Sequence, residues 1–297
     1  MEIKNVTVFG AGVLGSQIAF QTAFHGFGVK VYDVRQDFLD KAKERFRMLG
    51  TRYIEDVNAT EKQIDEAMGK ISFTTDMQEA VMDADLTIEA IPENIQIKKE
   101  FYLKLGIIAP EKTVFVTNSS TLLPSQFAEE TGRPERFLAL HFANEIWKNN
   151  TAEIMGHADT DPEIFQKVVG FAKAIGMVAL PIYKEQPGYI LNSLLVPLLD
   201  AAMALYIKGV ANPETVDKTW MIATGAPKGP FGIYDVVGLT TAYNINKMKA
   251  EKGNLLAKKA AERLKTEFID KGKLGVATGE GFYSYPNPKY ESPDFLT

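Results

Sequence analysis

The chain has 297 residues, of which 45% are apolar and 24% are charged, a composition typical of a soluble globular protein large enough for two domains. Its net charge of −5 and the lack of a long basic run argue against a nucleic acid as partner. There is no cysteine, which excludes disulfides, thiolate catalysis and thiolate metal sites. The three histidines lack the paired spacing of a zinc site, so we predict no metal centre.

The beginning of the chain has the pattern strand, glycine turn, helix, strand. A β-branched run ends at Gly10, and Gly12 and Gly15 follow inside a helical pattern. The first glycine makes the turn, the second lets the backbone approach a pyrophosphate, and the third lets the helix pack on the strand. The second strand ends at Asp33, where a carboxylate can bond a ribose 2′-hydroxyl and repel a 2′-phosphate. We therefore predict a dinucleotide site that prefers NAD to NADP.

After Asp33 the pattern predicts a helical hairpin and then an alternation of strands and helices. The hairpin covers 38–53 and 61–69. The predicted strands are 71–74, 86–91, 113–117, 137–141, 152–155 and 177–182, and the helices among them are 76–81, 94–109 and 161–175. Polar residues follow two of these strands, in the runs Asn118–Thr121 and from His141 onward. Because α/β folds place ligands at the carboxyl ends of parallel strands, we expect a Rossmann-type, doubly wound, mostly parallel sheet with its site there.

From Pro187 onward helices predominate, and the sequence predicts them over 189–208, 213–222, 239–249 and 254–271. We therefore expect a cofactor domain over 1–184 and an all-helical substrate and dimerisation domain over 185–297. The run 194–205 is apolar nearly all round, which indicates a buried helix or a subunit interface, and we favour an interface.

Two features bear on location. The stretch 189–207 approaches membrane length, but it contains Pro197 and Asp200, so we expect a buried helix rather than a membrane span. The predicted first strand starts at Ile3, which leaves no room for a targeting segment, and we expect a cytoplasmic protein.

An enzyme that uses NAD to interconvert an alcohol and a ketone still has to move the hydroxyl proton, and histidine is the natural base. His141 stands where a predicted strand ends, whereas His25 ends a helix and His157 lies in a polar loop, where we expect it to be solvated. Glu153, twelve residues after His141, could face it from an adjacent strand and fix its tautomer. The alternative is that Glu153 is a surface residue of an edge strand.

Seven segments together resemble the 3-hydroxyacyl-CoA dehydrogenase family over nearly the whole chain. They are GAGVLGSQIA from Gly10, EAIPENIQIKKE from Glu89, TNSST from Thr117, the His141-Phe142-x-Asn144 strand end, PGYILNSLLVPLL from Pro187, GAPKGPFGIYDVVGL from Gly225, and GEGFYSY from Gly279. The resemblance implies that His141 is the catalytic base, that Glu153 orients it, and that Ser120 and Asn192 contact the substrate oxygen. It also implies cofactor contacts at Asp33, Glu93, Lys98 and Asn144, a homodimer formed through the helical domain, and a role in fatty-acid metabolism.

The chain departs from the family pattern in two places. Glu145 stands where the family has proline, in HFANEIWKNNTAE, and Ala277 stands where it has lysine. Trp147, near the first departure, is a candidate for shaping acyl specificity or a plain packing residue. The amino-acid sequence most resembles the diketoreductase branch of the family, which reduces 3,5-dioxo esters. The substrate therefore stays open between a CoA thioester, a free diketo ester and a sugar acid such as gulonate, and the non-enzyme alternative is an NADH-binding redox sensor or structural protein.

Overall fold

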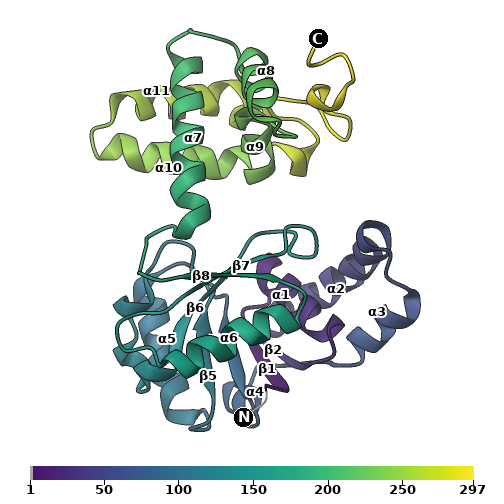
Figure 1. Ribbon diagram of the computed structural model, residues 1–297, viewed down its shortest axis with the longest axis vertical. Coiled ribbons are helices and arrows are strands. Elements are labelled where there is room, and N and C mark those ends of the chain that lie inside the picture. The colour runs from purple at the N-terminus through teal and green to yellow at the C-terminus, as the bar shows by residue number, and fades with distance from the viewer. Residues whose placement is uncertain (1–2) are drawn as a thin grey trace. The chain divides into compact units, whose positions relative to one another are not determined.

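The computed structural model describes residues 3–297 and divides into a first unit that ends at Ile190 and a second unit that begins at Leu191 (Figure 1). The domain boundary predicted after Lys184 lies before the boundary between these two units. The intervening segment belongs with the first unit because the ring of Tyr189 stacks on the ring of His141, with centroids 4.4 Å apart. The backbone N–H of Ile190 also donates to Glu153, at 2.9 Å.

The first unit is built on one eight-stranded sheet in the order β3-β2-β1-β4-β5-β6-β7-β8. Its strands are β1 Asn5–Phe9, β2 Gly28–Tyr32, β3 Ile71–Thr74, β4 Leu86–Glu89, β5 Val114–Thr117, β6 Phe137–Phe142, β7 Thr151–Met155 and β8 Val178–Ile182. The first six are parallel, and the chain reverses its winding between β1 and β4, so the predicted Rossmann-type, doubly wound sheet is confirmed. Strand β7 runs antiparallel to β6, which places Glu153 directly opposite His141.

Helices cover both faces of this sheet. They are α1 Val13–Phe24, α2 Gln36–Val57, α3 Glu61–Met68, α4 Met77–Val81, α5 Ile95–Ile108 and α6 Pro162–Ala174. Successive residues of a strand face opposite sides, so β1 buries Val8 with α1, α2 and α6 in one core and Phe9 with α4 and α5 in another. The sheet is therefore the middle layer of three, and the ligand-binding edge is left to the loops at its carboxyl ends.

The predicted helical hairpin is formed by α2 and α3. Helix α2 runs one turn beyond its predicted end and stops at Asn58, which adopts a left-handed conformation with φ 57°. Thr60 then opens α3 through a capping box, in which its hydroxyl accepts from the backbone of Gln63 and its own N–H bonds the Gln63 side chain. This tight connection explains why the sequence pattern breaks between the two helices.

The second unit is helical. It contains most of α7 Tyr189–Ile207, followed by α8 Pro213–Thr224, α9 Pro230–Val237, α10 Leu239–Glu251 and α11 Leu255–Glu267. Helix α9 has no counterpart among the predicted elements. Its first N–H groups are bonded by the buried carboxylate of Asp217, which accepts from Phe231 and Gly232, so a distant side chain rather than a local cap starts it.

Helix α7 is, within residues 3–297, the one helix long and apolar enough to cross a membrane by length and composition alone, with a mean hydropathy of 1.8. Only 17% of that apolar window is buried, and Leu194 has 69% of its surface exposed. The prediction of a buried helix at this position is therefore wrong for a single copy of the chain. Asp200 on the same helix pairs with Lys249, an arrangement that suits water better than lipid.

The prediction that the side chain of His157 is solvated is wrong. Its side chain is only 2% exposed, because the ring packs against Phe137 with centroids 6.1 Å apart, whereas the polar loop around it predicts a solvated side chain.

Candidate active site

The glycine turn joins β1 to α1, and each of its glycines has a separate structural reason. Gly10 has φ 98°, and a Cβ there would meet the carbonyl oxygen of Ala90 at 2.5 Å. A Cβ on Gly15 would meet the carbonyl oxygen of Gly10 at 1.9 Å, so only glycine lets α1 pack on the turn. A Cβ on Gly12 would meet nothing within 4 Å. Gly12 therefore borders open space at the N-terminus of α1, where no side chain of residues 3–297 caps the helix.

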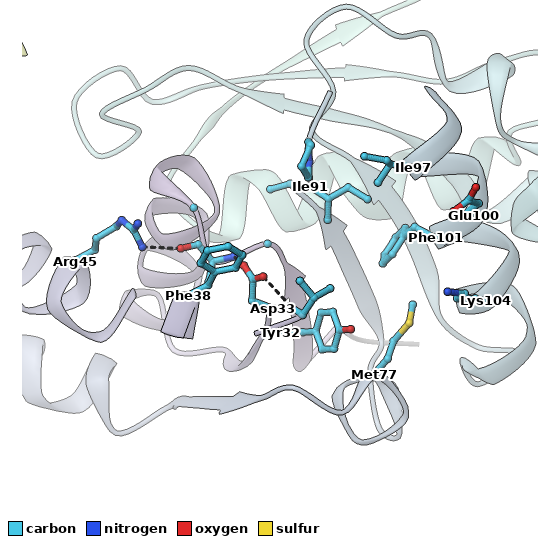
Figure 2. Close-up of a pocket in the computed structure, with 16 residues that line it drawn as sticks. Tyr32, Asp33, Phe38, Arg45, Met77, Ile91, Ile97, Glu100, Phe101 and Lys104 are labelled. Carbon is cyan, nitrogen blue, oxygen red and sulfur yellow. Dashed lines mark hydrogen bonds between the residues drawn. The ribbon is translucent and has the colours of Figure 1, made fainter. Parts of the chain in front are cut away.

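A cavity of about 710 Å³ opens beside this turn and is lined by Asp33 at the end of β2 (Figure 2). One carboxylate oxygen of Asp33 accepts from the backbone of Ala11, at 2.8 Å, which ties the acid to the glycine turn. Phe38 and Phe101, both labelled in Figure 2, also line this cavity and supply apolar rings that suit a flat base. Arg45 donates to the carbonyl of Ala11 at 2.8 Å and so braces the turn from α2. A carboxylate that can bond a ribose hydroxyl, with aromatic rings and the glycine turn lining the same cavity, fits the adenosine half of NAD.

A second cavity, of about 360 Å³, continues from the turn toward the end of β5. Gly12 and Gly15 line it together with Glu93, Lys98 and Ser120. The predicted phosphate-binding turn and the predicted substrate serine therefore border one space. This is the arrangement that a hydride-transfer site requires, because the reactive ring of the cofactor must meet the substrate.

Lys98 is a buried cation with two carboxylate partners. Its side chain is 1% exposed, and its Nζ lies 2.6 Å from Glu89 and 3.5 Å from Glu93. Glu89 also accepts from the hydroxyl of Thr117 at 2.7 Å, so β4, α5 and β5 are tied together below the cavity. Sequence analysis missed Glu89, although its position as the last residue of β4 is a signal that could have found it.

Glu93 has a different environment from Glu89 because it lies in the loop after β4. Burial would raise its pKa, but bonds from Ser119 and Thr121 and the nearby Lys98 hold that pKa below its ordinary value. Glu93 is therefore an anion at neutral pH, and it fastens the polar run after β5 to the loop after β4.

His141 stands at the centre of a line of three polar side chains. Its Nδ1 lies 3.0 Å from Glu153 Oε2, and its Nε2 lies 3.2 Å from Ser120 Oγ. His141 and Glu153 are 6% and 3% exposed, so both are shielded from water. The carboxylate can accept only from Nδ1–H, which fixes that tautomer and leaves Nε2 free to exchange a proton on the Ser120 side.

Tyr189 completes the surroundings of His141, and sequence analysis did not single it out. Its ring lies nearly parallel to the imidazole, at an angle of 14°, and its hydroxyl donates to the carbonyl of Ser119 at 2.7 Å. The backbone of Tyr189 is in the left-handed region with φ 57°, which costs a non-glycine residue conformational energy that its contacts must offset. The aromatic residue inside the quoted PGYILN motif was the available signal.

Two predicted site residues join neither this line nor the lining of the two cavities. Asn144 is exposed on the loop after β6, where its carbonyl accepts from the side chain of Asn149. Asn192 belongs to the second unit, so its contact with the substrate oxygen stays a prediction.

Comparison with known proteins accounts for both units. Residues 5–186 match the 3-hydroxyacyl-CoA dehydrogenase NAD-binding domain, and residues 188–285 match the C-terminal domain of the same family. The hydroxyacyl-coenzyme A dehydrogenase of Homo sapiens mitochondria is 34% identical over 292 residues, covering 95% of this chain and 91% of that protein. A probable 3-hydroxybutyryl-CoA dehydrogenase of Bacillus subtilis is 32% identical, covering 96% and 98%.

Among solved structures, one described as a diketoreductase in dual catalysis of dicarbonyl compounds is 58% identical. It covers 96% of this chain and 100% of its own, with a TM-score of 0.92. The chain therefore belongs to the 3-hydroxyacyl-CoA dehydrogenase family and is an NAD-dependent oxidoreductase with that family's Rossmann and helical domains.

Proposed function

We propose that this enzyme interconverts 3-hydroxyacyl and 3-oxoacyl compounds, with His141 as the general base in oxidation and the general acid in reduction. The observation that carries the proposal is the line Ser120, His141, Glu153, which ends at a cavity shared with the glycine turn. NAD, when bound, accepts or supplies the hydride. The residues of the chain therefore have to bind the substrate, orient it and move one proton.

The proton path follows from the bonds of the imidazole. In reduction, His141 Nε2 gives its proton to the substrate oxygen, and Ser120 hydrogen-bonds the same oxygen, with Asn192 proposed as a second donor. Glu153 accepts from Nδ1–H and stabilises the imidazolium that exists before the transfer. Tyr189 covers one face of the ring and limits access of water. A positioned acid–base group of this kind contributes roughly 10²–10⁴-fold to the rate.

Of the open substrates, we propose a dicarbonyl ester in preference to a CoA thioester. The support is the 58% identity to the diketoreductase, set against 34% to the human CoA enzyme. The charge of the hairpin agrees with it, because residues 36–70 hold eight acidic and seven basic side chains. Most of these basic side chains are already paired with acids of the hairpin: Lys41 with Asp37, Lys43 with Asp40, Arg47 with Glu44, Arg52 with Asp56, and Lys62 with Glu66. The phosphates of CoA would find little uncompensated positive charge there.

The test is NADH oxidation by the purified protein with acetoacetyl-CoA beside a 3,5-dioxohexanoate ester, each titrated to give kcat/KM. We expect the ester to win by at least about tenfold, which is about 1.4 kcal/mol of transition-state preference. A thioester that wins by the same factor would overturn the substrate proposal and leave the reaction type intact. Binding of NADH with no turnover of either compound would instead favour the redox sensor or structural protein.

We also propose that the protein is a cytoplasmic homodimer that buries the exposed apolar side of α7. Leu191, Leu194 and Leu205 expose 43%, 69% and 40% of their surfaces, an apolar exposure that a second copy would cover. Light scattering after gel filtration should show a dimer for the wild type and a weakened dimer for Leu194→Lys. A monomeric wild type, or one that partitions with membranes, would contradict this proposal.

A further inference from the structure

The loop 143–150 joins the two strands that hold the catalytic pair. His141 lies one residue before the end of β6, and Glu153 is the third residue of β7. In addition to the hydrogen bonds within the loop, side chains of other elements contact it and hold it in place. The indole Nε1–H of Trp147 donates to Asp56 Oδ2 at 2.9 Å, across 91 residues of sequence. Asp56 is the next-to-last residue of α2, so the hairpin reaches the loop.

Asp56 gathers donors from both the loop and its own helix. Besides Trp147, Lys148 lies 3.3 Å from its Oδ1, and Arg52 donates to Oδ2 at 3.1 Å. Arg52 also contacts the loop residue Glu145, at 3.3 Å. The carboxylate is 17% exposed, and the Trp147 bond is the main reason that its pKa lies below the ordinary value. Asp56 is therefore an anion at neutral pH that binds the loop at two consecutive residues.

The loop conformation depends on such outside support. Glu145 adopts a left-handed backbone with φ 57°, and its N–H donates to Gln17 of α1 at 2.8 Å. The Trp147 ring lies 5.5 Å from the ring of Tyr53, and the guanidinium of Arg52 lies 5.6 Å above it. A strained residue and a half-buried indole keep one position only where neighbours determine it. Asp56 supplies the hydrogen bond that holds the indole of Trp147, and Gln17 supplies the one that holds the backbone of Glu145.

We propose that Asp56 is a positioning residue of this enzyme: it fixes Trp147 and thereby the loop beside His141, so that the loop is ordered before the 3-oxo substrate binds. The proposal rests on the proposed function for its kinetic part. A loop that is already ordered spends no binding energy on ordering itself, so loss of the anchor weakens substrate binding more than it slows the chemical step.

The experiment uses the full-length enzyme with Trp220→Phe as background, because Trp147 and Trp220 are the two tryptophans of the chain. Acrylamide quenching of the remaining indole reports whether Trp147 is held. Asp56→Ala should raise the quenching constant at least about twofold and the KM of the oxo substrate at least about fivefold, with kcat within about twofold. Asp56→Asn retains an oxygen that can accept from the indole, so it should restore most of both values.

Asp65→Ala is the matched control. It removes an exposed carboxylate from α3 of the same hairpin, and it should leave the quenching constant and KM unchanged. Trp147→Phe removes the N–H from the other side of the bond and should reproduce the KM rise without depending on how Asp56→Ala folds.

Each other outcome counts against the proposal. An unchanged quenching constant in Asp56→Ala means that the carboxylate does not hold the indole, and a raised quenching constant with an unchanged KM means that the anchor is structural only. A wild type that reduces no oxo substrate would refute the proposed function and with it the kinetic part, while quenching still decides whether Asp56 holds the loop.

Discussion

Replacing Glu153 by glutamine is the sharpest test of the site, because it removes one charge and keeps the shape. The two carboxylate oxygens have different partners: Oε1 accepts from the backbone N–H of Ile190 and Oε2 faces His141 Nδ1. In the glutamine variant, the Ile190 N–H still needs an oxygen, so the amide NH₂ must point toward Nδ1. The imidazole then carries its proton on Nε2. That nitrogen must be unprotonated to act as the base in oxidation.

The size of the effect follows from the distance. A carboxylate and an imidazolium whose charge centres are about 4 Å apart attract each other by about 4 kcal/mol at an effective dielectric constant of about 20. Loss of that attraction corresponds to roughly a thousandfold in rate, since about 1.4 kcal/mol is a factor of ten. We therefore expect kcat for oxidation of the 3-hydroxy substrate to fall by about three orders of magnitude.

The assay is NADH formation under saturating substrate, with NADH affinity measured separately by fluorescence titration. The NADH affinity should stay within about threefold, because the glycine turn and Asp33 are untouched. A Glu153→Gln enzyme within about tenfold of the wild-type kcat would refute the role given to the pair, and a lost NADH affinity would mean that the variant is disturbed beyond this bond.

Three further predictions concern neighbouring groups. Tyr189→Phe keeps the ring on His141 but removes the donor to the Ser119 carbonyl, so the free energy of unfolding should fall by about 1–3 kcal/mol in urea titrations, and an unchanged midpoint would contradict that bond. Asp33→Asn keeps an acceptor for the Ala11 N–H but removes the charge, so the ratio of kcat/KM for NADH over NADPH should fall at least about tenfold, and a constant ratio would show that Asp33 does not select the cofactor. Because the folded-state pKa of Glu93 is below the unfolded value of 4.5, its stabilisation is complete above that value and is lost as the pH falls through the folded pKa. Stability of Glu93→Gln should therefore fall less between about pH 5 and pH 3 than that of the wild type, and parallel curves in urea titrations would refute the assignment.

The sequence by itself determined the parts of this protein that depend on near neighbours. The strand, glycine turn and helix around Gly12 follow from a local residue pattern, and the caps at Asp76 and Asn94 from side chains that bond N–H groups two or three residues ahead. The family resemblance added the roles of His141 and Glu153. Their spacing alone did not decide whether they form a catalytic pair or whether Glu153 is a surface residue of an edge strand.

The tertiary structure decided what depends on pairing across the chain. The antiparallel register of β6 and β7 sets Glu153 opposite His141, and a shift of one residue would have turned it to the other face of the sheet. The stacking of Tyr189 on His141 joins residues far apart in sequence, and the bond from Trp147 to Asp56 links a loop to a helix of a different part of the fold. No local pattern encodes such contacts, because they exist only once the sheet order has brought the elements together.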